Sequence, residues 1–259
     1  MVQDGPEPPG TMKLQIDLNA DLGEGAGHDD ELFGLISSAS IACGVHAGDP
    51  SLVRESIETA NRAGVSIGAH PSFWDRENFG RRELAVAPED IFTLIIYQLG
   101  AFCALARQAG VTVHHAKPHG ALYNMAVRDR TLADAIARAI CFVDPSLLLF
   151  APNGSELARA GEAHGLRIAH EVFADRNYLG NGLLVHRSRP EALLHDPAEA
   201  AGRVIRMLRE GRVRSVEGKD VEVVADTVCL HGDNAESVEF ARALRESLEK
   251  EGVVIQSIK

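Results

Sequence analysis

The sequence predicts an α/β fold, an irregular barrel of parallel strands with helices outside it. Short apolar runs of strand length alternate along the chain with longer amphipathic stretches, which is the pattern of strand–helix units that build a parallel sheet. About seven such units can be counted. The chain has 259 residues, close to the roughly 250 residues of a (β/α) barrel. An open, doubly wound sheet fits the same alternation, but length and unit count favour a closed (β/α)7-type barrel.

The strands are expected where the short apolar runs lie. In chain order these are Leu14–Asn19, Ser40–Cys43, Val65–Ala69, Val111–Ala116, Leu147–Ala151, Arg167–Phe173 and Asp226–His231, followed by a last apolar run at Val253–Ile255. Each run is short enough to be a buried strand of a parallel sheet.

The amphipathic stretches between these runs predict helices. They are Ser51–Ala63, Pro88–Gln108, Thr131–Val143, Ser155–His164, Pro197–Arg209 and Ala235–Lys250. Asp49, Asp129 and Asp196 precede three of them and are expected to cap the first helical turn, since a carboxylate there accepts free backbone N–H groups. Several helices are followed by glycine, which is typical of a helix end.

One segment departs from the alternation. Arg212–Val216 and Val221–Ala225 flank Glu217-Gly218-Lys219-Asp220, a pattern that predicts a small β-hairpin inserted into the barrel. No Gly/Ser linker or shift in composition divides the chain, so residues 12–259 are expected to form a single barrel domain. Residues 1–11, MVQDGPEPPGT, are expected to be a mobile extension or a tag.

Charge and composition exclude several classes of partner. Lys+Arg is 26 and Asp+Glu is 37, a formal net charge of −11. A chain this acidic does not attract nucleic acid or an anionic membrane through its overall field. No uninterrupted apolar run reaches the roughly 20 residues of a membrane span, and the start has no secretory pattern. We therefore expect a cytoplasmic protein with neither a nucleic-acid nor a membrane partner.

The 4 cysteines are widely spaced and form no Cys-x-x-Cys pair. We expect them to be buried thiols, because a disulfide framework is rare in so long a chain and a zinc knuckle has no ligand pair to start from.

Ionisable residues gather where the predicted strands end. In a parallel α/β barrel the active site lies at that face, and residues that alternate along a strand point to one side of it. The candidate site residues are Asp17, Asn19, Asp21, His46, His70, Lys117, His119, Asp175, Arg176 and His231. One of His114 and His115 is expected to point inward as well. So many polar groups at one end of a barrel exceed what packing requires, so a functional site is predicted there.

Two long connections are expected to cover this face. One is Pro71–Ala87, which includes Trp74 and Arg81, and the other runs from Asp175 to Arg187. Glycine, aromatic residues and arginine are typical of loops that exclude water and hold an anion. The sequence has no phosphate-binding P-loop, no dinucleotide fingerprint, no His-Glu-x-x-His and no Gly-x-Ser-x-Gly.

These residues also carry a family resemblance. Seven motifs, DLNADLGE (17–24), IACGVHAGD (41–49), GAHPS (68–72), NFGRR (78–82), KPHGALYN (117–124), EVFADR (171–176) and CLHGD (229–233), closely resemble the LamB/YcsF family, in order over about residues 12–258. Two departures are small. Val45 stands where an aromatic residue is usual, and Trp74 where proline is frequent, which leaves the shape of the first loop in doubt.

The resemblance implies a fold, an activity and partners. The fold is a (β/α)7-type barrel akin to glycoside hydrolases and polysaccharide deacetylases. The activity is the ATP-dependent opening of 5-oxo-L-proline to L-glutamate by a 5-oxoprolinase, in which the family's members form one component, called A, together with subunits B and C. The implied ligands are 5-oxoproline and ATP, the latter alone or with magnesium. A homo-oligomer is left open.

The implied reaction suggests a role for each candidate. A lactam is a poor electrophile, so the site has to activate water, protonate the ring nitrogen and bind anionic groups. As hypotheses, Asp17 or Asp21 is the general base, with Asn19 beside them. His46, His70, His119 and His231 supply acid–base groups. Lys117, Arg176 and Arg81 bind anions, with Asp175 next to Arg176. Protein-bound metal is not assigned.

Two other functions are weighed beside this one. Asp and His at strand ends suit a zinc-like ion, so the alternative is a metal-dependent amidohydrolase or deacetylase acting without ATP. A non-catalytic scaffold for a complex is the third, and the polar barrel mouth argues against it.

Overall fold

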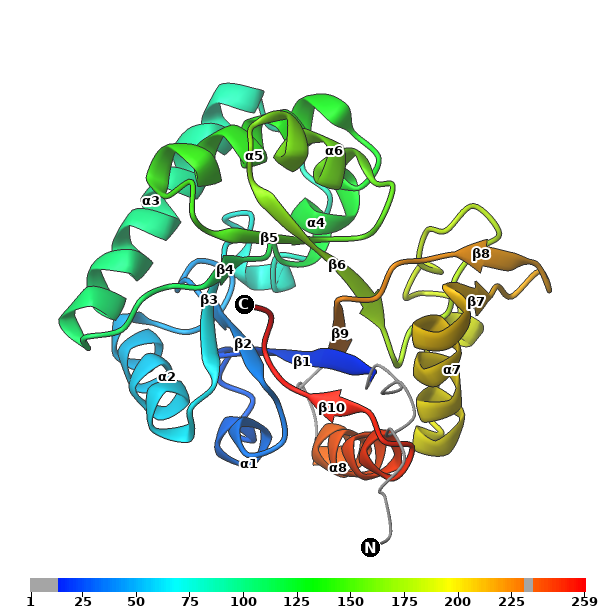
Figure 1. Cartoon of the computed structure of the whole chain (residues 1–259). Coiled ribbons are helices and arrows are strands. Elements are labelled where there is room, and N and C mark those ends of the chain that lie inside the picture. The colour runs from blue at the N-terminus through cyan, green and yellow to red at the C-terminus, as the bar shows by residue number, and fades with distance from the viewer. Residues whose placement is uncertain (1–13, 231–234) are drawn as a thin grey trace, which may run out of the picture.

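A closed barrel of parallel strands forms the centre of the computed structural model, which describes residues 14–230 and 235–259 (Figure 1). The barrel strands are β1 (Gln15–Leu22), β2 (Ser38–Ala42), β3 (Ser66–His70), β4 (His115–Ala116), β5 (Leu148–Ala151), β6 (Arg167–Phe173) and β9 (Thr227–Leu230). Each pairs in parallel with the next in that order, and β9 pairs with both β6 and β1. This double pairing closes the barrel and confirms the predicted fold class.

Helices surround the barrel (Figure 1). They are α1 (Asp29–Phe33), α2 (Pro50–Ala63), α3 (Pro88–Gln108), α4 (Gly120–Ala126), α5 (Arg130–Val143), α6 (Glu156–Ala163), α7 (Pro197–Glu210) and α8 (Ala235–Lys250), with 3-10 turns at Arg76–Asn78 and Pro190–Ala192. The predicted helices all form, with ends within one residue of expectation. The short α1 and α4 were not predicted, because neither is long enough to show a helical period.

The three predicted caps are confirmed. The Asp49 carboxylate accepts the backbone N–H groups of Ser51 and Leu52 at 2.8 and 3.0 Å. Asp129 and Asp196 accept N–H groups in the same way at the starts of α5 and α7. These three aspartates therefore have a structural role as helix N-caps.

The fourth strand is much shorter than predicted. Only His115 and Ala116 pair with β3 and β5, whereas the expected strand began at Val111. Val113 is buried all the same. The apolar run therefore predicted burial correctly. It did not predict which residues pair in the sheet, because an apolar pattern indicates burial and not backbone hydrogen bonding.

The predicted hairpin is present as β7 (Arg212–Arg214) and β8 (Asp220–Glu222), which pair antiparallel. Its loop is residues 215–219, not the expected 217–220, because Arg214 lies opposite Asp220. The Val216 N–H donates to the carbonyl oxygen of Tyr178 at 2.9 Å. The hairpin therefore packs against the loop that follows β6.

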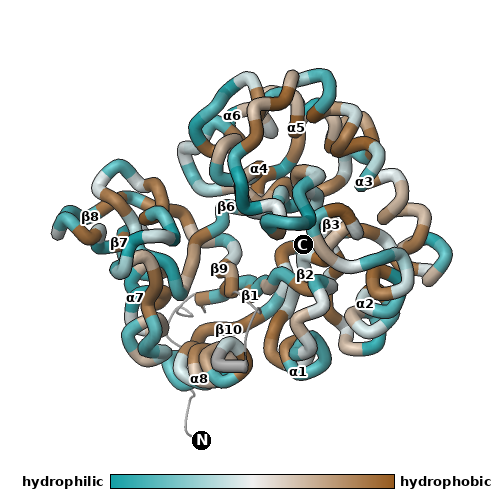
Figure 2. The backbone as a smooth tube through the Cα atoms, turned by 180° about the vertical axis from the view of Figure 1, so that it is seen from behind, coloured by the Kyte–Doolittle hydropathy of each residue, from teal (hydrophilic) through white to brown (hydrophobic). Residues whose placement is uncertain are grey.

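The chain's own C-terminus closes the amino-terminal end of the barrel. After α8, β10 (Val254–Ile255) pairs with the start of β1, and the C-terminus lies over the barrel's centre in both views (Figures 1 and 2). His114 Nε2 lies 2.7 Å from the Ile258 carbonyl oxygen, and Ile258 packs against Phe150. The carboxyl ends of the strands are left as the end available to a ligand.

His115 fills the barrel interior. Its ring stacks on Phe150 with 4.0 Å between centroids, and its Nε2 lies 3.2 Å from Ser40 Oγ. A Cβ on Gly68 would lie 2.1 Å from the same ring. Burial holds the pKa of His115 well below its usual range, so the ring is a neutral core group.

The helix α3 is long and apolar enough to cross a membrane by length and composition, with 33% of its most apolar window buried. It packs along α5 in the outer layer of the barrel (Figure 1). A single helix of this kind is weak evidence for a span, because a core helix of a folded domain can pass the same test of length and composition.

Gly68→Ala tests the packing of the barrel interior. We expect the variant to lose about 1–3 kcal/mol in the free energy of unfolding, because the added methyl group must displace the buried His115 ring. Gly100→Ala is the control, since its Cβ meets nothing within 4 Å on α3, and it should be neutral or stabilising by up to about 1 kcal/mol. Urea unfolding of both variants measures the difference. Equal stabilities would contradict the tight interior.

Candidate active site

A cavity of about 430 Å³ lies at the carboxyl end of the barrel. Asp21 from β1, His70 from β3 and Glu171 from β6 line it, together with Lys117 and His119 just after β4. Phe173 at the end of β6, with Tyr178, Leu183, Leu184 and Val185 from the loop that follows, forms the apolar part of the lining. The cavity therefore has a polar floor and a largely apolar wall.

Lys117 is the most heavily bonded group of the floor. Its Nζ lies 2.8 Å from Asp21 Oδ1, 2.8 Å from Glu171 Oε1 and 3.0 Å from Asn19 Oδ1. It also lies 3.1 Å from Cys229 Sγ. An ammonium group has only three donors, so these partners use all of them.

The charge on Lys117 is held in place by its surroundings. Burial alone would lower the pKa of the ammonium, but the carboxylates of Asp21 and Glu171 outweigh it and raise this pKa well above the usual range. One buried cation thus faces two carboxylates. The charge of Lys117 is already matched inside the protein, which leaves it little capacity to bind a ligand anion.

Glu171 is fixed on all sides. The Asn19 amide donates to its Oε1 at 3.1 Å, and the Tyr123 hydroxyl donates to its Oε2 at 2.6 Å. Burial, followed by the charge of Glu171, raises the pKa of Tyr123 well above its usual range. Tyr123 therefore remains a hydroxyl donor.

Asp17 lies apart from this group. Its carboxylate accepts hydrogen bonds from Ser37 and Ser38 at 2.7 Å each and from Thr227 at 2.6 Å, and it is not among the residues that line the cavity. Burial raises its pKa against the effect of these hydroxyls. Of the two aspartates expected to be the base, only Asp21 reaches the cavity.

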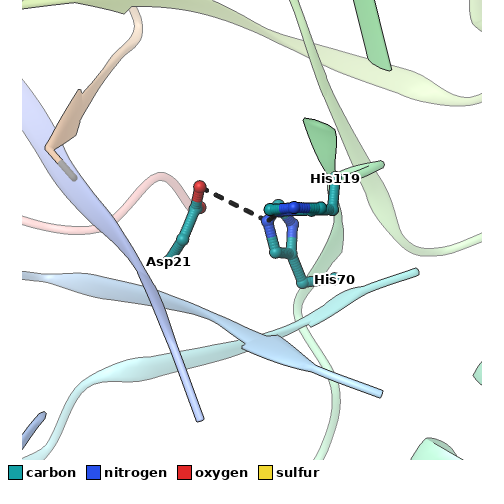
Figure 3. Close-up of side chains that lie close together, drawn as sticks. All are labelled: Asp21, His70 and His119. Atoms are coloured by element: carbon teal, nitrogen blue, oxygen red, sulfur yellow. Dashed lines mark hydrogen bonds and ion pairs between the residues drawn. The ribbon is translucent and has the colours of Figure 1, made fainter. Parts of the chain in front are cut away.

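Asp21, His70 and His119 lie together on the floor (Figure 3). His70 Nε2 is 3.3 Å from Asp21 Oδ2 and 2.9 Å from His119 Nδ1. The other ring nitrogens face backbone carbonyls, since His70 Nδ1 lies 2.7 Å from Lys117 O and His119 Nε2 lies 2.9 Å from Phe79 O. A carbonyl can only accept, so these nitrogens carry the hydrogens.

In the neutral rings, the two nitrogens that face each other therefore both carry lone pairs. Burial, and then the nearby His46 and His70, hold the pKa of His119 well below its usual range. Two lone pairs at 2.9 Å repel unless a proton or a cation lies between them. This is an arrangement ready to accept positive charge, with the Asp21 carboxylate beside it.

A second carboxylate reaches the same place. Glu24 Oε1 is 3.0 Å from His46 Nε2 and 3.5 Å from His119 Nδ1. The rings of His46 and His119 stack at 3.9 Å with an interplanar angle of 7°, and His46 Nδ1 lies 2.8 Å from Ser72 Oγ. Burial lowers the pKa of His46, partly offset by its hydrogen bond to Glu24.

These donors fit a metal ion. The ligand atoms of Asp21, His70 and His119 lie within 4.8 Å of one another, as do those of Glu24, His46 and His119. Histidines that bind metal usually donate their other N–H to a carbonyl or carboxylate, as His70 and His119 do here. A carboxylate and two imidazoles are ligands that zinc and similar ions prefer.

The two long loops behave differently. The loop after β6 lines the cavity from Arg176 to Arg187, as expected. From the loop after β3, Arg81 and Glu83 line the cavity, and Phe79 packs behind it against the His119 ring at 5.6 Å. Trp74 is 70% exposed and stacks on Tyr97 of α3. The doubt raised by Trp74 therefore concerns the outer surface and not the cavity.

The structure thus sorts the predicted residues. It brings together Asn19, Asp21, His46, His70, Arg81, Lys117, His119 and Arg176 around the cavity. Asp175 is half-buried next to Arg176 but does not line the cavity, and His231 lies outside the described residues.

Sequence reasoning missed four contributors to the site, namely Glu24, Tyr123, Glu171 and Cys229. Glu171 had a usable signal, a charged residue inside an apolar strand, which is rare unless it is paired. The others stand in the motifs of the family resemblance but carry no local pattern that marks them.

Comparison with known proteins gives a consistent result. The LamB/YcsF family model matches residues 16–259. The chain is 50% identical over 248 residues to the A subunit of a 5-oxoprolinase from Bacillus licheniformis, covering 94% of this chain and 98% of that protein. It is similar to the crystal structure of a lactam utilization protein from Thermus thermophilus, with a TM-score of 0.89, 45% identity, and 95% and 100% of the two chains covered. A deacetylase solved with substrate shares the fold at a TM-score of 0.50 and 14% identity, over 95% and 88% of the chains.

Lys117→Met tests the charge balance of the cavity floor. The variant leaves two buried carboxylates without their cation, so we expect the free energy of unfolding to fall by about 3–5 kcal/mol. Adding Glu171→Gln removes one of the stranded charges and should restore part of the loss. Chemical unfolding of the two single variants and the double variant measures this coupling. Additive losses would contradict it.

Proposed function

The chain belongs to the LamB/YcsF family, and from that premise we propose that it is the A component of an ATP-dependent 5-oxoprolinase. In this proposal it opens the lactam of 5-oxo-L-proline to L-glutamate together with partner subunits B and C. Its relatives from Bacillus licheniformis and Geobacillus kaustophilus are each named as the A component of a 5-oxoprolinase, which supports the reaction and the existence of partners.

One observation carries the proposal beyond the family. A buried histidine pair, held by backbone carbonyls so that one nitrogen of each ring faces the other, lies beside a carboxylate in a cavity with an apolar part to its lining. Ring opening needs a group that takes a proton from water and a group that gives one to the ring nitrogen. The pair His70–His119 with Asp21 can do both in turn, because its two facing nitrogens can share one proton and Asp21 stabilises the charge that the pair then carries.

The reaction can be written with its atoms balanced. The γ-phosphoryl group of ATP is transferred to the lactam oxygen, which makes that oxygen a leaving group. Water then bonds to the ring carbon and gives its proton to the His70–His119 pair. The C–N bond breaks, and the ring nitrogen takes the proton and becomes the amino group of glutamate. This leaves the former ring carbon as an acyl phosphate. A second water bonds to that carbon as its C–O bond to the phosphoryl group breaks, which gives the side-chain carboxylate of glutamate and inorganic phosphate.

The partner subunits take the nucleotide in this scheme. The chain has no P-loop, so we assign the binding of ATP and its magnesium to subunits B and C and the water-dependent step to this chain. Lys117 acts as a positioning residue that orients Asp21 at 2.8 Å. We place the enzyme in the cytoplasm, where 5-oxoproline and ATP meet.

Asp21→Asn tests this assignment. In an assay of glutamate release from 5-oxoproline and ATP, with subunits B and C present, we expect turnover to fall at least about 100-fold, because the charge beside His70 is lost. The control is Asp134→Asn, which removes a carboxylate from the outer surface, where Asp134 pairs with His164. Omitting B and C should also abolish glutamate release. Wild-type turnover in Asp21→Asn would overturn the assignment.

A second function is favoured by the same donor atoms. Asp21, His70 and His119, with Glu24 nearby, would hold a divalent ion. When bound, such an ion would polarise an amide carbonyl or lower the pKa of water. The chain would then be a metal-dependent amidohydrolase acting without ATP, and Glu171 and Lys117 would still fix the position of Asp21.

Metal removal separates the two functions. For the metal-dependent function we expect about one equivalent of zinc-like metal in the purified chain, lost in His119→Gln and retained in the surface control His164→Gln. Chelator treatment should then abolish any ATP-independent amide hydrolysis. Metal content near zero in the wild type, with glutamate release unaffected by the chelator, would exclude this function.

A further inference from the structure

A buried arginine lines the cavity without an anionic partner. Arg176 is 5% exposed, yet its guanidinium makes one hydrogen bond, from Nη2 to the Val185 carbonyl oxygen at 2.7 Å. Its Nε is buried with no hydrogen-bond partner. Within the described part of the chain it forms no ion pair. Buried guanidinium groups are normally paired, because an uncompensated charge in a protein interior is costly.

The surroundings of Arg176 increase this cost. Burial, and then the like charge of Arg187, lower the pKa of Arg176 to about 10, and its neighbour Asp175 offsets only part of the effect. Arg187 lines the same cavity. Arg187 is exposed to solvent whereas Arg176 is buried, so an anion in the cavity would compensate chiefly the charge of Arg176.

Two other cations that line the cavity, Lys117 and Arg128, are already occupied. Lys117 donates to Asn19, Asp21 and Cys229 and also forms an ion pair with Glu171. Arg128 donates to Glu83 Oε1 at 2.6 Å. Arg176 differs because most of its donors are unused and water is largely excluded from it. A planar guanidinium with free N–H groups matches a carboxylate in a two-bond geometry.

The apolar wall suits a compact ring. Phe173, Tyr178, Leu184 and Val185 line the cavity beside Arg176, so the methylene groups of a small ring would lie against carbon atoms. The Tyr178 hydroxyl accepts the Phe173 backbone N–H at 2.9 Å, so it is oriented by the backbone and carries no charge. Arg176 therefore supplies the charged contact in this part of the cavity.

We infer that Arg176 binds the carboxylate of the substrate and restricts this site to small cyclic amides that carry a carboxylate on the ring. The inference rests on the proposed function for the identity of the substrate. It assigns the anion contact to Arg176 and not to Lys117. With the carboxylate held at Arg176, the ring amide lies across the cavity toward the polar floor.

The test compares an acid with its neutral amide. Binding of 5-oxo-L-proline and of 5-oxo-L-prolinamide to the full chain is measured by calorimetry, for the wild type, Arg176→Met and Arg176→Lys. We expect Arg176→Met to weaken binding of the acid about 10- to 100-fold, the loss typical of a buried charged hydrogen bond, and to leave the amide nearly unchanged. Arg176→Lys keeps the positive charge but loses the planar guanidinium, so its affinity for the acid should lie between those of the wild type and Arg176→Met.

The ratio of the two affinities is the deciding quantity, because general loosening of the site would weaken both ligands together. Arg189→Met is the control, an exposed arginine of the same region that pairs with Glu191, and it should keep the wild-type ratio. A wild-type ratio in Arg176→Met overturns the inference, and so does a wild-type chain that does not prefer the acid.

Measurements of turnover distinguish failure of the inference about Arg176 from failure of the proposed function. If the complex with subunits B and C releases glutamate and Arg176→Met has an unchanged KM for 5-oxoproline, the inference is wrong and the proposed function stands. If no glutamate forms in the wild type but the acid still binds through Arg176, the proposed function fails and the carboxylate site stands.

Discussion

The interaction on which the site depends is the buried ion group around Lys117. Its ammonium joins Asp21 on β1 to Glu171 on β6 at 2.8 Å each, and Lys117 itself follows β4. The Lys117 Nζ atom thus connects side chains from three strands of the barrel. A buried charge group of this kind contributes little net stability. Its benefit is geometric, because Asp21 has a single position from which to face His70.

The histidine arrangement follows from that fixed point and from the backbone. Carbonyl oxygens of Lys117 and Phe79 hold one nitrogen of each ring, so the tautomers of His70 and His119 are set before any ligand arrives. Phe79 can present its carbonyl because it adopts φ of 55°, and Gly80 next to it leaves the space that a Cβ would take 3.0 Å from the His119 ring. A strained turn thus holds the proton acceptor in place.

The sequence predicted the barrel because that prediction needs only burial and periodicity. The predicted end of β6 at Phe173 and both predicted ends of α3 agree with the structure, since apolar period and helix-terminal residues define them.

The site was predicted as a group of residues, because strand ends meet at one face, but the role of each residue was not predicted. Asp17 and Asp21 are four residues apart on one strand with the same side-chain direction. The two residues differ only in how deep they lie along the barrel axis. That depth depends on which strands pair with β1, which the sequence does not show. Glu24 and Tyr123 were missed for the same reason, since their importance lies in contacts with His46 and Glu171 made across the fold.

The acidic net charge of the chain and the cations in the cavity have opposite effects on a small anion. A chain with a formal charge of −11 repels small anions at long range, so an anionic substrate must be bound by local charge. On the cavity floor, Asp21, Glu24 and Glu171 outnumber Lys117, which favours binding of a proton or a cation there and disfavours a carboxylate. The apolar part of the lining, which includes Leu184 and Val185, also carries Arg176 and Arg187. A ring with a carboxylate at one end and an amide at the other has one favourable orientation between these two sides, with its amide toward the histidines. In the proposed function, the charge distribution of the cavity would therefore orient the substrate as well as bind it.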